Sequence, residues 1–170
     1  MNYSTHALKT DGTLWSWGYN LYGELGLNQH GTPSNASNSQ SSPTQVPGTT
    51  WSNISTYTYG GVGTKTDGTL WAWGRNTYGT LGQNDTTHRS SPIQIPGTTW
   101  SNVIGSIYSI AAVKTDGTLW AWGQNHTGQL GQNSATPGIS SPVQIPGSWS
   151  QKTQHIGGIT ESGFGIMKVL

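Results

Sequence analysis

The 170-residue sequence contains no cysteine, which excludes a disulfide framework and a thiolate metal site. Charged residues make up only 8 % of the chain, far below the usual quarter or so, and the formal net charge is +1. A chain with this charge balance lacks the basic surface that nucleic-acid binding requires. We therefore expect no nucleic-acid partner.

Long apolar runs are absent as well. No run is long enough to cross a membrane, and residues 1–6 show no basic segment leading into an apolar stretch, as a signal peptide would. We expect no membrane insertion. Solubility then depends on Ser, Thr, Asn and Gln, a composition common on secreted and virion surfaces. It slightly favours an extracellular or virion location over the cytoplasm, although the compartment stays undetermined.

The chain does contain nine Trp and seven Tyr, which indicate a packed structure. Two of the Trp positions belong to a ten-residue string, Lys-Thr-Asp-Gly-Thr-Leu-Trp-Ala-Trp-Gly, at residues 65–74 and 114–123. A third copy at residues 9–18 has Ser16 in place of alanine. Such close repetition indicates an array of one supersecondary unit.

The unit has the pattern of a four-stranded sheet. Asp-Gly between runs of Thr, Leu and Trp predicts a β-hairpin with a type I′ turn. In the second strand Trp71 and Trp73 point one way while Leu70 and Ala72 point the other, so this strand should be buried on both faces. The nine indoles are expected to pack between neighbouring sheets.

A loop with glycine at three fixed offsets follows each Trp-Gly, which predicts positive φ or close backbone approach. A short strand bounded by proline comes next, and a Pro-Gly turn leads into a further strand that begins at Trp-Ser. The proline-bounded strands are expected at residues 43–47, 92–96 and 142–146, and the Trp-led strands from residues 51, 100 and 149. A longer polar surface loop is expected around residues 32–39.

These elements predict an all-β fold of propeller blades, each with about four antiparallel strands and three per chain. The chain is expected to be a single domain, 1–170, with repeats at about 1–51, 52–100 and 101–149. Residues 150–170 are expected to supply completing strands.

The motif Lys-Thr-Asp-Gly-Thr-Leu-Trp-Ala-Trp-Gly-x-Asn-x-x-Gly-x-Leu-Gly at residues 65–82 resembles the repeat of the regulator of chromosome condensation family. The resemblance extends over essentially the whole chain. It implies a β-propeller, which has seven blades in the family against three repeats here. It also implies guanine-nucleotide exchange on a small GTPase as a candidate function; chromatin binding, the other candidate, is disfavoured by the near-neutral charge.

The two ends of the sequence fall at different points of the repeated unit. The first repeat has no Trp-led strand before residues 6–9, and a strand is left over after Trp149. Because exposed strand edges invite pairing, we expect a head-to-tail homo-oligomer that closes the propeller through terminal strands, with two copies giving six blades. A longer array, or an open arc held by other proteins, is the alternative.

No arrangement of residues supports catalysis. The turn aspartates Asp11, Asp67 and Asp116 are explained by backbone geometry, and the five histidines lack metal-ligand spacing. We expect the repeated lysines 9, 65 and 114 to pair with a nearby aspartate or to be solvated. The repeated asparagines 20, 76 and 125 should bond their own loops. We expect no enzyme activity, cofactor or metal.

If the loops gather on one face, residues that vary between repeats form an aromatic and polar surface suited to a protein or a glycan. The expected partner-facing residues are Tyr19, Tyr22, Arg75, Tyr78, Gln124 and His126. A non-catalytic module for protein–protein interaction or structural assembly is the function that this pattern favours. A carbohydrate-binding propeller and a nucleotide-exchange factor are the alternatives.

Overall fold

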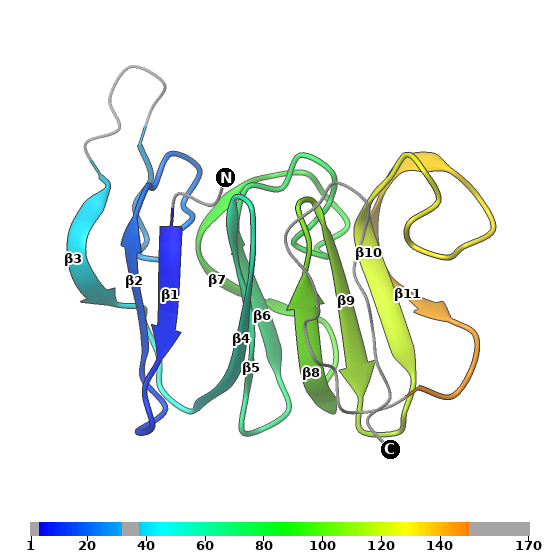
Figure 1. Cartoon of the computed structure of the whole chain (residues 1–170), viewed down its shortest axis with the longest axis horizontal. Helices are drawn as coiled ribbons and strands as arrows, with labels where there is room; N and C mark the ends of the chain where they lie inside the picture. Colours follow the sequence, from blue (N-terminus) through cyan, green and yellow to red (C-terminus); the bar gives the residue numbers. More distant parts are fainter. Residues whose placement is uncertain (1–3, 32–37, 150–170) are drawn as a thin grey trace.

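The computed structural model describes residues 4–31 and 38–149, which form three antiparallel sheets standing in a row (Figure 1). We call the sheets blades 1 to 3. Blade 1 consists of β1 (Ser4–Leu8), β2 (Leu14–Gly18) and β3 (Gln40–Gln45). Blade 2 consists of β4 (Trp51–Tyr57), β5 (Gly60–Lys65), β6 (Leu70–Gly74) and β7 (Arg89–Ile95). Blade 3 consists of β8 (Trp100–Gly105), β9 (Ser109–Lys114), β10 (Leu119–Asn125) and β11 (Thr136–Ile145).

This architecture confirms the all-β prediction and the three blades. Blade 1 has three strands in the described residues because β1 matches the second strand of the other blades, β5 and β9. The predicted completing strands at 150–170, and most of the predicted polar loop at 32–39, lie outside the described residues. No helix long and apolar enough to span a membrane occurs in the described part of the chain.

The Asp-Gly hairpins are present, but the predicted turn type is wrong. In the β5–β6 turn Gly68 N–H donates to Lys65 O (3.0 Å) and Lys65 N–H donates to Thr69 O (2.9 Å). Only Gly68 has a positive φ, +78°. This is the three-residue loop in which a left-handed glycine follows a type I turn, and a type I′ turn would need positive φ at Asp67 as well.

The aspartate of this turn, Asp67, links the turn to a tryptophan side chain through hydrogen bonds. Asp67 Oδ1 accepts hydrogen bonds from Thr69 N–H (3.0 Å) and Thr69 Oγ1 (2.7 Å), and Trp71 Nε1 donates to the same hydroxyl (2.8 Å). The other two turns repeat this Asp–Thr–Trp chain. These hydrogen bonds therefore hold both the turn and the indole N–H of one tryptophan in place.

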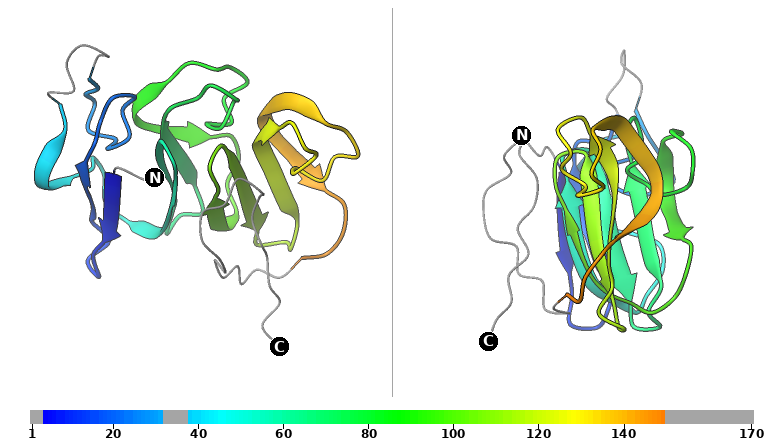
Figure 2. Two further views of the ribbon diagram at one scale, coloured as in Figure 1. Left: turned by 45° about the horizontal axis from the view of Figure 1, so that its top comes forward. Right: turned by 90° about the vertical axis from the view of Figure 1, so that its right-hand side faces the viewer.

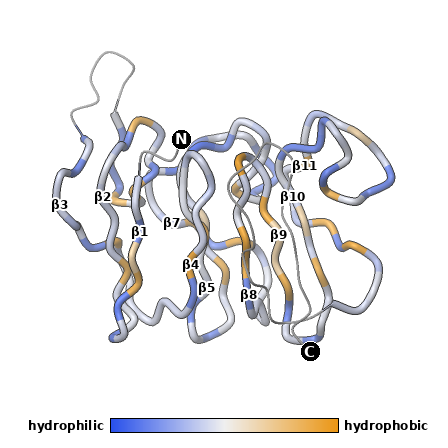
Figure 3. Tube along the Cα trace, viewed as in Figure 1, coloured by the Kyte–Doolittle hydropathy of each residue, from blue (hydrophilic) through white to orange (hydrophobic). Residues whose placement is uncertain are grey.

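The second strand of the hairpin is buried on both faces, as predicted. Leu70 and Ala72 belong to the apolar cluster between blades 2 and 3, whereas Trp71 and Trp73 pack into the cluster between blades 1 and 2. Hydrophobic residues concentrate along the strands, most visibly on β9 (Figure 3). Two of the apolar clusters are thus layers between blades, and a third, smaller one lies on blade 3 beside Trp149.

Blades 2 and 3 each insert one indole into the blade before it. Trp73 of blade 2 is 0 % exposed, and its Nε1 donates to Glu24 O of blade 1 (3.0 Å). Trp122 of blade 3 is also 0 % exposed and donates in the same way to Thr80 O of blade 2 (2.8 Å). Both contacts bring together residues 42 to 49 positions apart in the sequence.

A glycine in the preceding blade makes room for each of these indoles. A Cβ atom on Gly26 would lie 3.0 Å from the ring of Trp73, and one on Gly82 would lie 3.1 Å from the ring of Trp122. Both glycines also have φ near +67°. The glycines at fixed offsets therefore serve the predicted purposes of left-handed backbone and close approach.

The first strands of blades 2 and 3, β4 and β8, contact each other directly. Asn53 Nδ2 donates to Asn102 Oδ1, and Gly105 N–H donates to Ser55 Oγ (2.9 Å). The join between blades is therefore apolar over its middle and hydrogen-bonded along this edge.

We expect Trp122→Ala to lower the free energy of unfolding by about 3–5 kcal/mol, because it empties a fully buried site between two blades. Trp122→Phe should cost less, since it keeps most of the apolar contact and loses the bond to Thr80 O. Urea unfolding followed by circular dichroism measures both. Equal stability of Trp122→Ala and the wild type would contradict this account of the core.

Candidate aromatic surface

One edge of the blade row collects aromatic side chains from two kinds of segment. The loops after each Trp-Gly and the β4–β5 and β8–β9 turns lie at the upper edge in Figure 1, whereas the Asp-Gly hairpins lie at the lower edge. The upper loops hold Tyr22 and Tyr78, and the two turns hold Tyr59 and Tyr108. Antiparallel strands joined by short turns place these positions at the same edge.

The rings form a continuous series, which we call the aromatic row. Its members are His88, Tyr22, Tyr59, Tyr108, Tyr78 and His126, with successive ring centroids 5.3, 5.9, 5.8, 5.0 and 5.5 Å apart. Tyr59 and Tyr108 are stacked at 19°, and the other four pairs are edge-to-face. These distances are those of favourable aromatic pairs. The four tyrosines are partly exposed and the two histidines are exposed.

Arg75 lies over the middle of the aromatic row. Its guanidinium carbon is 4.9 Å from the ring centre of Tyr22, 4.8 Å from Tyr59 and 5.9 Å from Tyr108, within the range of cation–π attraction. Its Nε donates to Thr77 Oγ1 (2.8 Å). Among the described residues the one ion pair is between Arg89 and Asp85, so the charge of Arg75 has no carboxylate in contact.

Arg75 also affects the titration of its neighbours. Partial burial and the charge of Arg75 lower the pKa of His88, which is therefore neutral at pH 7. Burial and the adjacent Tyr59 raise the pKa of Tyr108. Both shifts favour the uncharged form of the ring, at His88 on one end of the row and at Tyr108 in its middle.

Four of the six expected partner-facing residues meet at this surface: Tyr22, Arg75, Tyr78 and His126. Gln124 contributes its backbone, since its N–H donates to Tyr108 O (2.9 Å), and Tyr19 holds the matching position in blade 1, where it is partly buried. Sequence reasoning missed Tyr59, Tyr108 and His88. The two tyrosines could have been found, because each lies six residues before a repeated lysine, Lys65 or Lys114.

The repeated asparagines hold the loops that support the row, as predicted. Asn76 is 0 % exposed; its Oδ1 accepts from Leu81 N–H (2.8 Å) and its Nδ2 donates to Asp85 O (3.0 Å). Asn20 and Asn125 make the same pair of bonds in their own loops. A buried amide with both ends bonded fixes a loop that has no regular structure.

Of the repeated lysines, Lys9 is exposed, as one of the two expectations had it, whereas Lys65 and Lys114 are partly buried against aromatic rings. Lys65 Nζ lies over two indoles, 4.9 Å from the ring centre of Trp51 and 4.3 Å from that of Trp71. Lys114 lies between two indoles in the same way, and Lys9 lies 4.0 Å over Trp15. These cations pack on aromatic faces and form no ion pair with the turn aspartates.

Beneath the Tyr22 end of the row lies a buried carboxyl group. Glu24 is 1 % exposed; its Oε2 accepts from Tyr22 N–H (2.7 Å), and its buried Oε1 has no partner. Burial, opposed by backbone bonds and by Arg75, raises the pKa of Glu24 to about 7. In blade 3 Gln129 occupies the matching position and accepts from Thr127 N–H in the same manner (3.0 Å).

His6 lies next to Glu24, between blades 1 and 2. Its Nε2 lies 3.1 Å from Glu24 O, the carbonyl that also accepts from Trp73, and its buried Nδ1 has no partner. Burial lowers the pKa of His6 to about 4, so the ring is neutral at pH 7. The Glu24 loop therefore links the aromatic row to the join between two blades.

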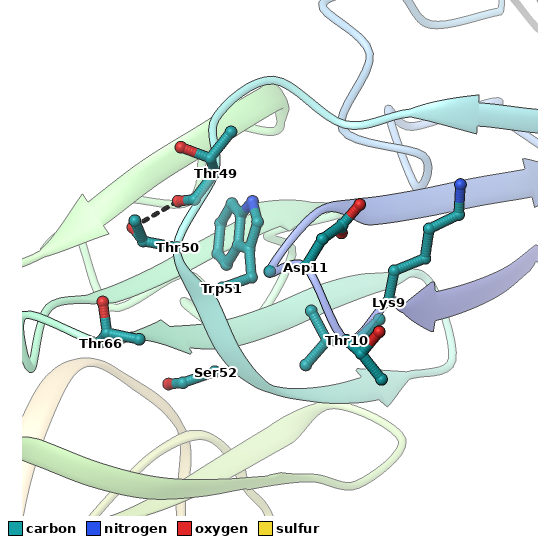
Figure 4. Close-up of a pocket in the computed structure, with 10 residues that line it drawn as sticks. Lys9, Thr10, Asp11, Thr49, Thr50, Trp51, Ser52 and Thr66 are labelled. Carbon is teal, nitrogen blue, oxygen red and sulfur yellow. Dashed lines mark hydrogen bonds between the residues drawn. The ribbon is translucent and has the colours of Figure 1, made fainter.

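A pocket of about 590 Å³ opens at the opposite edge, between the β1–β2 turn and the start of β4 (Figure 4). Threonines 10, 49, 50 and 66 line it together with Lys9, Asp11 and Trp51. In blades 2 and 3 the matching edge is bonded, because Thr66 N–H donates to Thr50 O (2.9 Å) and Thr115 N–H donates to Thr99 O (2.8 Å). Within the described residues no backbone acceptor reaches Thr10 N–H. The pocket therefore marks the open edge of β1.

The fold and its repeated loops define a protein built from β-propeller blades. Residues 11–61, 67–110 and 116–158 match the regulator of chromosome condensation (RCC1) repeat. These matches extend over most of the sequence, and the chain belongs to the RCC1 repeat family. No curated protein sequence matches it significantly.

Solved propellers of the same family share the fold. The crystal structure of human WBSCR16 matches with a TM-score of 0.70 at 24 % identity over 84 % of this chain and 35 % of its own. Prp20p of Saccharomyces cerevisiae, studied for its binding to Gsp1p and histones, matches with a TM-score of 0.72 at 18 % identity over 85 % of this chain and 36 % of its own. Yeast RCC1 (Prp20) bound by Kap60 gives a TM-score of 0.67 at 18 % identity, over 85 % of this chain and 34 % of its own. This chain spans about a third of the length of these proteins.

We expect Glu24→Gln to become more stable relative to the wild type as pH rises from about 4.5 to 7. The folded protein binds the Glu24 proton more tightly than the unfolded chain does, so wild-type stability falls over this interval. The slope should be at most about 1.4 kcal/mol per pH unit. Titration of His6 makes the folded protein more stable as pH rises from about 4 to 6.5. This effect is present in both proteins, so it cancels in the stability difference between Glu24→Gln and the wild type.

Denaturant unfolding at pH 5, 6, 7 and 8 measures this difference. Gln129→Glu is the matched control, because the same exchange at the partly exposed site in blade 3 should add little pH dependence. A stability difference between Glu24→Gln and the wild type that does not change with pH would contradict the proposed burial of an uncharged carboxyl group.

Proposed function

We propose that the chain is a non-catalytic module for protein–protein interaction and that the aromatic row is its binding surface. The observation that carries the proposal is the enclosure of Arg75 by three tyrosine rings at a partly exposed edge. Tyr and Arg are the residue types that dominate binding energy at protein interfaces. Here they occur together on loops held by buried asparagines, so little ordering would be needed on binding.

The chemistry of the row supports a particular kind of contact. Neutral tyrosine rings offer flat apolar area with hydroxyl groups at the rim, and Arg75 offers a positive charge whose carboxylate partner is missing from the described residues. A peptide segment that combines an apolar or proline side chain with a carboxylate complements both features. The related Prp20p binds proteins, with Gsp1p and histones studied as its partners and Kap60 bound to it in a crystal structure, which supports protein as the class of partner.

Nothing in the row supports a reaction. Its histidines lie at the two ends, and Glu24 is enclosed beneath Tyr22. A pair of groups poised for proton transfer would need direct contact with each other and with a bound substrate. We therefore place binding, and not chemistry, at this surface.

We expect Tyr59→Ala to weaken the binding of selected peptides by roughly 30-fold, which corresponds to about 2 kcal/mol at an interface hot spot. Peptides would be selected from a displayed random 12-residue library against the whole 170-residue chain, and their affinity measured by calorimetry. Arg75→Ala should weaken acidic peptides most. Tyr59→Phe is the matched control and should retain binding, because it keeps the ring that faces Arg75.

A glycan array probed with the same proteins tests carbohydrate as the alternative class of partner. Glycan binding that is lost in Tyr59→Ala, together with a library that yields no peptide, would replace protein with carbohydrate as the partner class. Peptides that bind wild type and Tyr59→Ala equally would remove the aromatic row as the binding surface.

A further inference from the structure

The contact between consecutive blades is built twice from the same parts. Beside the inserted indoles, Asn28 N–H donates to Ser90 O and Asn84 N–H donates to Ser140 O, both at 2.8 Å. The serines belong to β7 and β11 of the following blade. Asn28 and Asn84 both have φ near +58°, so the receiving loop has one conformation in both cases.

Close backbone approach accompanies these bonds. A Cβ on Gly23 would lie 2.4 Å from Ser90 Cα, and a Cβ on Gly79 would lie 2.3 Å from Ser140 Cα. The join between blades thus has two sides: a socket in the preceding blade, made by a Gly-x-Leu-Gly loop and an asparagine, and a plug in the following blade, made by an indole and a serine.

Blade 3 carries a third socket that no described residue fills. A Cβ on Gly131 would meet nothing nearer than Ile145 at 3.8 Å, and one on Gly128 would meet nothing nearer than 3.7 Å. Gly131 is exposed, whereas its counterparts Gly26 and Gly82 are buried. Asn133 nevertheless has φ +51°, so the loop already has the receiving conformation.

Blade 1 carries a third plug that no described residue receives. Trp17 stands at the position of Trp73 and Trp122, yet it is partly exposed while both of those are 0 % exposed. Ser41, which matches Ser90, is exposed as well. Thr5 and Ala7 on the same outward face of β1 are also exposed.

The free plug and the free socket lie at opposite ends of the blade row (Figure 2). Two intervening joins separate them, so they do not meet within the described residues of one chain. We propose that they meet between molecules: the plug of blade 1 in one copy of this chain enters the socket of blade 3 in a second copy. The contact is head-to-tail and repeats the join already present twice within each chain.

The proposed contact specifies two hydrogen bonds between the copies. Trp17 Nε1 donates to the second copy's Gln129 O, as Trp73 donates to Glu24 O, and the second copy's Asn133 N–H donates to Ser41 O. Two copies joined at both ends give a ring of six blades, within the usual range of four to eight. The expected terminal-strand exchange through residues 150–170 is a separate matter, since those residues lie outside the described part of the chain.

The test is the mass of the full 170-residue chain in solution, by light scattering and sedimentation over a wide concentration range. The wild type should give twice the chain mass of 18.1 kDa. Trp17→Ala and Gly131→Asn should each give the mass of one chain. Asparagine tolerates a left-handed backbone, and the open space at Gly131 admits its side chain, so Gly131→Asn keeps the fold while it fills the socket.

Mixing the two variants distinguishes a head-to-tail contact from any other. Trp17→Ala retains an intact socket and Gly131→Asn retains an intact plug, so the mixture should form one-to-one pairs that neither variant forms alone. Thr86→Asn, an exposed change in blade 2 away from both ends, is the control and should associate as the wild type does.

Thermal unfolding of each variant shows that it is folded. A wild type of single-chain mass at every concentration would overturn the inference, as would variants that still associate. Variants that become single chains but do not pair on mixing would overturn the head-to-tail arrangement.

Discussion

The structure depends on one kind of contact, the indole that blades 2 and 3 each insert into the blade before them. The ring removes a large apolar area from water, and its Nε1 still reaches a backbone carbonyl, so the polar atom is not left unpaired. Glycine beneath the ring allows this close approach. The contact joins one repeat to the next, so two of the apolar clusters are shared between neighbouring blades.

The two edges of the blade row are held by different hydrogen bonds, and both sets come from the same repeat. At the Asp-Gly edge an aspartate, a threonine and an indole form a chain of bonds that closes each hairpin. At the other edge a buried asparagine holds each loop, and the residues beside it are free to vary. The aromatic row combines Tyr22 and Tyr78 of these loops with Tyr59 and Tyr108 of the β4–β5 and β8–β9 turns.

Blade 1 differs from its neighbours in polar chemistry at the join. Where blade 2 has Thr80 and Val62, blade 1 has Glu24 and His6, two titratable groups enclosed beside Trp73. Each contains one buried atom without a partner. The repeat therefore tolerates a destabilising pair at one join while the indole contact itself is retained.

The sequence by itself determined the repeat, the hairpins, the burial of Leu70 and Trp73 on opposite faces, and the glycine and asparagine loops, because these follow from local spacing. The turn type could not be derived, since Asp-Gly suits both a type I′ turn and a type I turn with a left-handed glycine, and the bond from Thr69 decides between them. Only the tertiary structure placed the lysines on indoles, joined Tyr59 and Tyr108 to the loop residues, and left Trp17 and Gly131 without partners among the described residues. Those arrangements depend on which blade stands next to which, a relation between residues about fifty positions apart that no local pattern contains.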